Sequence, residues 1–151
     1  MEKIYAIKSF KELSNEELYQ ILKLRSEVFV VEQHCVFQDM DNKDQESLHV
    51  MCYIDDKLAA YTRVLPEGLS FEEVSIGRVI TSPLYRGLGL GKEIIEQSIA
   101  VCEKLFGIKP IRIGAQLYLK KFYNEFGFVE IGDVYIEDGI VHIEMVRNSN
   151  N

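Results

Sequence analysis

The sequence predicts a mixed α/β domain whose sheet is antiparallel at first and locally parallel in its second half, in the order β-α-β-β-β-α-β-α-β-β. Apolar residues recur with a helical period over 14–29, 90–106 and 117–126, and short apolar runs bounded by turns fill the segments between them. A hydrophobic share of 47% is enough for a core. The length of 151 residues suits a single domain, which we place at 1–147, followed by a flexible polar tail at 148–151.

The first half of the chain is predicted to hold one helix among strands. Residues 4–8 form a short strand, and Ser14 with Glu17 has the spacing of a capping box that opens the helix. The apolar residues from Leu18 to Phe29 recur with the period of that helix. The remaining elements are a polar loop over 35–47 and strands over 48–54, 58–65 and 73–81, the first two joined by a turn at 55–57.

The second half is predicted to alternate helices with strands. A helix over 90–106 carries an apolar side, and a second helix over 117–126 ends at Gly127, a residue type that favours helix C-termini. The strands of this half are expected at 111–115, 128–136 and 140–146, with a turn at 137–139 between the last two.

Composition excludes several classes of protein. The net charge of −7 makes general binding to nucleic acid or to an anionic membrane surface a poor expectation. No segment has the roughly 18 apolar residues of a membrane span, and charges interrupt the N-terminal residues 1–8 where a signal peptide would be apolar. Three scattered cysteines, Cys35, Cys52 and Cys102, indicate reduced thiols and a cytoplasmic location. No CxxC pair is present, so we expect no metal site.

The most informative segment is a glycine-rich turn between a strand and a helix. Glycines stand at 87, 89 and 91, flanked by Arg86 and Lys92. Backbone amides at such a helix N-terminus bind anions such as pyrophosphate. The Walker A pattern fails because Glu93 follows Lys92, and the dinucleotide GxGxxG pattern fails because Lys92 stands where it needs glycine. The spacing alone is also compatible with a strand–helix turn that requires glycine for its backbone conformation and binds no ligand.

The same turn resembles a known family. Arg86-x-x-Gly89-x-Gly91 matches the [Q/R]-x-x-G-x-[G/A] motif of the GNAT N-acetyltransferases. The resemblance implies a GNAT-type fold, with a central, mostly antiparallel sheet, a splayed central strand pair and flanking helices. It also implies that acyl-CoA, most simply acetyl-CoA, is the co-substrate. Further segments resemble the family or its ElaA-like branch, namely 28–33, 76–79, 82–87, 115–116 and 137–142.

The resemblance also assigns expected contacts with coenzyme A. Backbone amides of the motif hold the pyrophosphate, the strand before it pairs with the pantetheine arm, and an amide near Val79 or Ile80 binds the thioester carbonyl. Gln116 stands near the place where relatives carry an asparagine, so its contact with the cofactor is left open. The residues expected to bind the cofactor are Val79, Ile80, Thr81, Arg86, Gly87, Leu88, Gly89, Leu90, Gly91, Lys92 and Gln116.

One tyrosine is expected to act in the reaction. The segment from Phe122 to Phe128 resembles the family's Y-x-x-x-G-F pattern, which makes Tyr123 the general acid that protonates the departing thiolate. The alternative is a core aromatic residue beside Phe122 and Phe126.

The general base is not assigned by the sequence. Gly77 stands where many relatives have a glutamate. The candidates are Glu32, His49, Glu73 and His142, acting directly or through water, with histidine the natural base at neutral pH. Glu32 also lies after the first helix, where the family's acceptor site is usually found.

The acidic segment 39–44 allows two interpretations. Lys43 and Asp44 break the calcium-loop pattern, so the segment is either a solvated acidic loop or a rim that attracts a cationic acceptor. Arg63, Arg78 and the 137–138 turn can pair within the sheet and serve structure alone.

The resulting prediction is an enzyme that transfers an acetyl group from acetyl-CoA to a primary amine by direct attack. The acceptor is a small-molecule or peptide amine, and exposed edge strands allow a homodimer. Two alternatives remain, a non-catalytic acyl-CoA-binding regulatory module on the same fold and a protein-interaction domain without cofactor.

Overall fold

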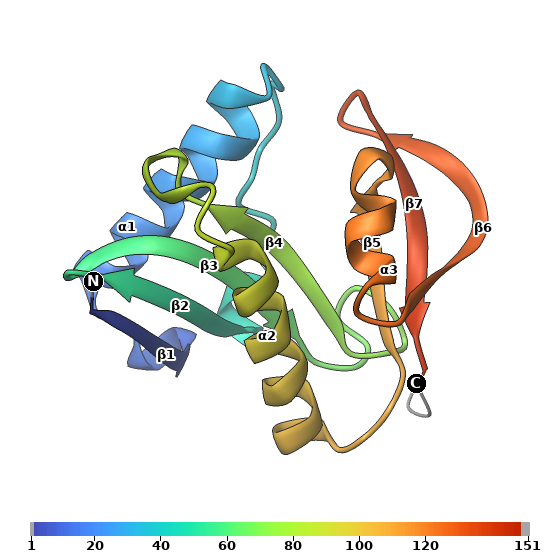
Figure 1. Ribbon diagram of the computed structural model, residues 1–151, viewed down its shortest axis with the longest axis horizontal. Helices are drawn as coiled ribbons and strands as arrows, with labels where there is room; N and C mark the ends of the chain where they lie inside the picture. The colour runs from blue at the N-terminus through green and yellow to red at the C-terminus, as the bar shows by residue number, and fades with distance from the viewer. Residues whose placement is uncertain (1, 149–151) are drawn as a thin grey trace.

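The computed structural model describes residues 2–148, so the predicted tail lies outside the described residues except for residue 148. The chain forms two sheets that meet at one edge (Figure 1). The first has the antiparallel order β1-β2-β3-β4, and the second the antiparallel order β5-β7-β6. The strands are β1 (Lys3–Ser9), β2 (Leu48–Ile54), β3 (Lys57–Leu65), β4 (Ser75–Thr81), β5 (Ile111–Gln116), β6 (Phe128–Glu137) and β7 (Ile140–Arg147).

Among residues 2–148, the hydrogen-bonded contact between the two sheets lies where β4 and β5 begin. Val74 and Ile111 form a parallel bridge, and the Arg112 amide donates to the Val74 carbonyl at 3.0 Å. Beyond this point β4 and β5 diverge (Figure 1). The expected mixed, mostly antiparallel architecture with a splayed pair of strands is therefore confirmed, and the splay opens a space between the sheets.

Helices cover both faces of the first sheet. α1 (Asn15–Arg25) continues as a π-helix, η2 (Ser26–Glu32), and packs on one face, while α2 (Leu90–Phe106) packs on the other. The predicted capping box opens α1, since Ser14 and Glu17 each accept from the other's amide, at 3.1 and 2.8 Å. None of the described helices is long and apolar enough to cross a membrane.

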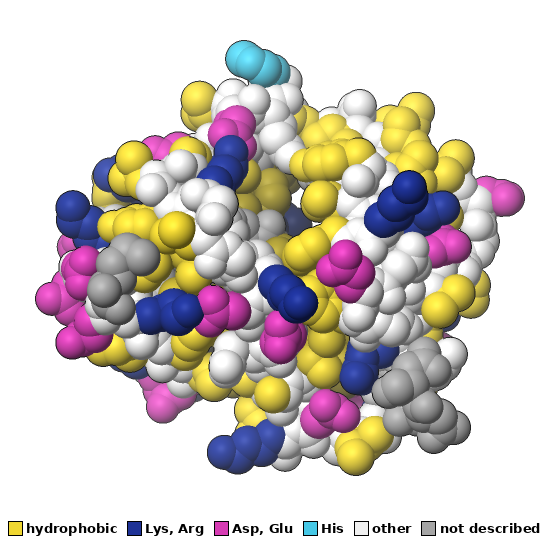
Figure 2. All heavy atoms as spheres, in the orientation of Figure 1, with side chains coloured by type: hydrophobic (Ala, Val, Ile, Leu, Met, Phe, Trp, Pro, Cys, Tyr) yellow, Lys and Arg dark blue, Asp and Glu magenta, His cyan; other side chains and the backbone are white. Residues whose placement is uncertain are grey.

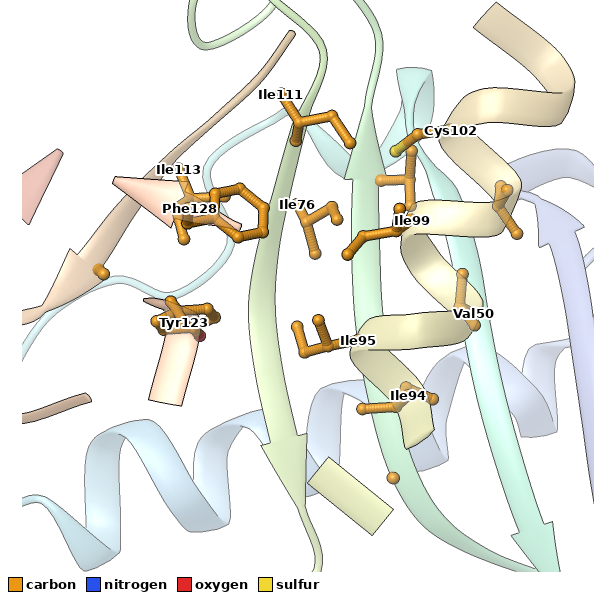
Figure 3. Close-up of a cluster of buried hydrophobic side chains, with 14 of the residues drawn as sticks. Val50, Ile76, Ile94, Ile95, Ile99, Cys102, Ile111, Ile113, Tyr123 and Phe128 are labelled. Carbon is orange, nitrogen blue, oxygen red and sulfur yellow. The ribbon is translucent and has the colours of Figure 1, made fainter. Parts of the chain in front are cut away.

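The main core lies between α2 and both sheets. Alternation along the strands puts Ile113 and Ala115 of β5 and Ile143 and Met145 of β7 into this core, so the opposite face of β5 and β7 is left for the space between the sheets. Figure 3 shows Tyr123 beside this cluster.

The second predicted helix is shorter than expected. A 3-10 turn over Leu117–Leu119 precedes α3 (Lys120–Asn124), which has five residues. The amides of Glu125, Phe126 and Gly127 each bond to the carbonyl three residues earlier, which tightens the chain into a turn instead of extending α3.

Candidate active site

A cavity of about 960 Å³ lies between the diverging strands. Its walls come from β4, from the cavity-facing side of β5, β6 and β7, and from η2 and the loop after it. Figure 2 shows the surface hollowed between the two halves of the molecule. The opening therefore follows from the splay of β4 and β5.

The glycine-rich turn sits at one end of this cavity. Gly87 and Gly89 have φ of 84° and 77°, and Gly89 caps the 17-residue α2 without any side-chain hydrogen bond. Within residues 2–148, the first amides of α2, from Leu90 to Lys92, have no hydrogen-bond partner, and the first bond of the helix is from the Glu93 amide to the Gly89 carbonyl. A row of free amides at a helix N-terminus suits a pyrophosphate, which is the anion that coenzyme A carries.

The predicted cofactor residues fall into two groups. Val79, Ile80, Thr81, Arg86, Gly91 and Gln116 line the cavity, and residues 87–90 join Arg86 to Gly91 along the chain. The Leu90 side chain is buried in the main core, so only its backbone is available to a ligand. Lys92 borders a separate groove beside α3.

A bulge interrupts β4 at the middle of the cavity. Tyr61 pairs with Ile80 and Arg63 pairs with Gly77, so Arg78 and Val79 together oppose a single residue of β3. Arg78 has φ of 51°, which is uncommon for a residue with a side chain. The bulge turns part of the β4 backbone away from its partner strand, at the place where the thioester carbonyl is expected.

The Arg78 side chain is held in place by the loop after η2. Its Nε donates to Asp39 Oδ1 and its Nη2 to the Asp39 carbonyl, both at 2.8 Å. The guanidinium also lies 5.9 Å from the ring centres of both Phe29 and Phe37. These contacts hold the bulge in its left-handed conformation.

The acidic loop is part of a buried ionic network. Arg25, which is fully buried, donates to Asp39 Oδ2 at 2.8 Å and to Asp44 Oδ1 at 2.7 Å. Arg63 binds both oxygens of Asp41 at 2.8 Å and Asp44 at 3.0 Å. Both interpretations of segment 39–44 were therefore wrong, because the three aspartates neutralise arginines that come from α1, β3 and β4.

Tyr123 lines the cavity and also packs in the core. Its ring contacts Phe122 and Phe128 edge-on, at 5.2 and 6.1 Å between ring centres. Burial, with a smaller contribution from Tyr118, raises the pKa of Tyr123, so its hydroxyl keeps its proton. The hydroxyl has no hydrogen-bond partner within the part of the chain that the structure describes.

His142 is the candidate base that reaches the cavity with a free nitrogen. Its Nδ1 lies 2.7 Å from the Ile140 carbonyl, which can only accept, so Nδ1 carries the hydrogen and Nε2 of the neutral ring has a lone pair. Glu137 Oε2 is 3.7 Å from Nε2, and the Tyr135 ring stacks on the imidazole at 5.6 Å.

The other candidate bases are placed differently. His49 is fully buried outside the cavity, with Nδ1 at 2.6 Å from the Tyr61 hydroxyl and Nε2 at 3.0 Å from the Asp44 carbonyl. Burial lowers the pKa of His49, and both nitrogens are occupied, which indicates a structural role. Glu32 lines the cavity but binds Arg86 at 2.6 and 2.8 Å, which lowers the pKa of that carboxyl.

Glu73 likewise forms an ion pair, because Arg112 binds both its oxygens at 3.1 Å. The hydrogen bonds from Arg112 lower the pKa of Glu73, which makes it a weak base. Glu73 is also absent from the residues that line the cavity.

The comparisons with known proteins decide the family. Residues 9–149 match the family model of an acetyltransferase (GNAT) domain. The chain belongs to the GNAT family. It is 43% identical to protein ElaA of Escherichia coli over 138 residues, 90% of each chain, and 39% identical to UPF0039 protein sll0451 of Synechocystis over 147 residues, 97% and 96% of the two chains.

Solved structures agree with this assignment. A crystal structure of an acyl-CoA N-acyltransferase from Pseudomonas aeruginosa has a TM-score of 0.92 at 39% identity, covering 97% of this chain and 99% of that one. The crystal structure of Escherichia coli ElaA has a TM-score of 0.90 at 39% identity, covering 97% and 100%. The expected resemblance to the ElaA-like branch is confirmed, and GNAT membership supports acyl-CoA-dependent N-acyltransferase activity.

Several residues of this GNAT site were not predicted from the sequence. The Tyr135 ring stacks on His142. The Tyr135 hydroxyl lies so close to Gly114 that a Cβ at that position would be 2.8 Å from the hydroxyl oxygen. A glycine inside a strand often marks a place where another group comes close to the backbone. Gly114 could therefore have indicated such a neighbour from the sequence alone. Two contacts span the cavity, from Gln33 to Gln116 at 3.1 Å and from the Cys35 thiol to the Asp138 carbonyl at 2.8 Å, and no local pattern indicates them.

Proposed function

We propose that this protein transfers an acetyl group from acetyl-CoA to a primary amine, with His142 as proton acceptor and Tyr123 as proton donor. The observation that carries the proposal is one cavity that joins an anion-binding helix N-terminus to a protonated tyrosine and a histidine with a free Nε2. Acetyl-CoA supplies the activated acyl thioester.

The chain's own backbone supplies the binding groups for the cofactor. The free amides at the N-terminus of α2 would bind the pyrophosphate, and the bulged part of β4 offers main-chain groups from Val79 to Thr81. Arg86 is bound to Glu32 at the cavity wall, which ties η2 to the pyrophosphate turn. The main-chain groups of the turn and of β4 therefore suffice to orient the cofactor.

His142 is suited to take a proton from the acceptor amine. The hydrogen bond to Ile140 fixes the ring orientation and leaves the Nε2 lone pair directed away from the backbone. Once His142 is protonated, Glu137 at 3.7 Å stabilises the imidazolium. Glu137 is mostly exposed, so the proton has a route to solvent.

Tyr123 is suited to assist departure of the thiolate. An ordinary phenol, with a pKa of about 10, is a weaker acid than an ordinary thiol at about 8.5. The buried hydroxyl therefore stays protonated until the sulfur departs, donates a hydrogen bond as negative charge develops there, and then passes its proton to the thiolate. The resulting phenolate recovers a proton from water in the open cavity.

Thiol release from acetyl-CoA over a panel of primary amines tests the proposal. Tyr123→Phe should lower kcat by about 100-fold or more, as expected for loss of a general acid, with coenzyme A affinity unchanged. Tyr118→Phe is the matched control, since Tyr118 also lines the cavity but is 73% exposed. An unchanged kcat in Tyr123→Phe would remove that residue from the mechanism.

His142→Gln tests the base separately. It should lower kcat/KM for the amine by about 100-fold or more, as expected for loss of a general base, with coenzyme A affinity unchanged. Tight coenzyme A binding with no thiol release for any amine would instead favour the non-catalytic acyl-CoA-binding module.

A further inference from the structure

The cationic side chains that line the cavity are paired with carboxylates, with one exception. Arg63 and Arg78 are neutralised by the aspartates of the loop, and Arg86 by Glu32. Lys43 also lines the cavity, and among residues 2–148 its ammonium group has no carboxylate within ion-pair distance. Its Nζ instead lies 2.9 Å from the Ser70 hydroxyl. The loop that looks acidic in sequence therefore presents one uncompensated positive charge to the cavity.

A second observation fixes the position of Lys43 at the cavity wall. Asp41 Oδ1 accepts from both Arg63 Nη1 at 2.8 Å and the Lys43 amide at 3.1 Å. Arg63, Asp41 and Lys43 all line the cavity. The backbone that carries Lys43 is therefore held in place, and its ammonium group remains available to a ligand carboxylate.

This region is separate from the pyrophosphate turn. Arg63 pairs with Gly77 in the first half of β4, and Ser70 precedes that strand, whereas the turn follows Thr81 at its other end. The seven residues of β4 span roughly 20 Å. The anion that Lys43 would bind is therefore not the pyrophosphate of coenzyme A.

We propose that the acceptor is an amine that also carries a carboxylate, as a free amino acid does, and that Lys43 and Ser70 bind this carboxylate. The inference rests on the proposed acyl transfer. A single uncompensated charge with one hydroxyl suits a carboxylate better than a phosphate with its higher charge. His142 and Glu137 on the second sheet face the same cavity and suit the ammonium end of such an acceptor.

Matched acceptors test the proposal directly. Amino acids such as tyrosine and lysine are compared with their decarboxylated counterparts, tyramine and cadaverine, by thiol release from acetyl-CoA. The amino acids should be preferred at least tenfold in kcat/KM. Lys43→Met should abolish this preference by slowing the amino acids, while the decarboxylated amines change less than twofold. Lys43→Arg should retain the preference.

The control variant is Lys57→Met, which removes an exposed lysine at the start of β3 and should change the turnover of neither acceptor. Preference for the decarboxylated amines in the unmodified protein, or an equal loss for both acceptors in Lys43→Met, would overturn the assignment.

A binding measurement separates this inference from the proposed function. Titration calorimetry with N-acetyltyrosine and its neutral amide, in the presence of coenzyme A, needs no turnover. The carboxylate form should bind at least tenfold more tightly, and Lys43→Met should remove the difference. Equal binding of the two forms overturns the carboxylate site, whereas selective binding without thiol release overturns only the acyl transfer.

Discussion

Gly114 and Tyr135 offer a test of how the cavity wall is built. A Cβ on Gly114 would lie 2.8 Å from the Tyr135 hydroxyl, with no other atom within 4 Å. Ordinary contact begins at 3.4 Å, so in Gly114→Ala the hydroxyl must move by about half an ångström. Tyr135 stacks on His142, and the movement therefore disturbs the candidate base as well.

The expected energy combines two opposing contributions. Overpacking costs about 1–3 kcal/mol, and here the low end applies because the clash involves the tip of one side chain. Replacing glycine by alanine recovers about 0.4–1 kcal/mol by restricting the unfolded chain, since Gly114 lies outside the left-handed region. We expect Gly114→Ala to destabilise the protein by about 0.5 kcal/mol and to lower kcat.

Tyr135→Phe provides the matched background, because it removes the oxygen that clashes. In that background Gly114→Ala should stabilise the protein by about 0.5 kcal/mol, which gives a coupling energy of about 1 kcal/mol. Urea unfolding of the two single variants and the double variant measures this coupling. Equal destabilisation by Gly114→Ala in both backgrounds would refute the contact.

Three further predictions concern the pyrophosphate turn and the ionic network. Gly89→Val places a branched residue at φ of 77° and should weaken coenzyme A binding at least tenfold, whereas Gly139→Val, at φ of 76° in the β6–β7 turn, should leave it unchanged; calorimetry compares the two. Asp39→Asn removes an acceptor shared by two arginines and should cost about 3 kcal/mol in urea unfolding, and a loss below 0.5 kcal/mol would contradict the network. Burial by itself raises the pKa of Asp41, but Arg63 lowers it overall below the usual 3.8. The stabilising contribution is therefore present above about pH 4 and lost as the pH falls below it, and the acid unfolding curve of Asp41→Asn should be less steep than that of the unmodified protein.

Local patterns predicted much of this fold because their causes are local. The capping box of Ser14 opens α1 where expected, and apolar runs locate the strands to within a few residues. The glycines at 87 and 89 mark positive φ that other residues avoid. The shortened α3 is the exception, since its 3-10 hydrogen bonds are not visible in the apolar period.

Side-chain roles in the site depended on partners far away in the chain. Residue type did not decide among the two glutamates and two histidines considered as the base, but Glu32 is paired with a residue 54 positions away, and His49 has both nitrogens occupied. Asp39 and Asp41 looked like a solvated charge cluster because their arginine partners come from other elements. The same pairing leaves Lys43 as a cavity-lining cation without a carboxylate partner among residues 2–148, which the acidic composition of its loop did not indicate.

The order of helices and strands, the anion-binding turn and the family motif are properties of short segments, whose backbone preferences and spacing are written in consecutive residues. The splay of β4 from β5, the bulge at Arg78 and the pairing of the cavity-lining arginines Arg63, Arg78 and Arg86 arise from contacts between segments. Burial makes each unpaired charge or donor costly, so which groups remain free to meet a substrate is decided only when the elements pack together.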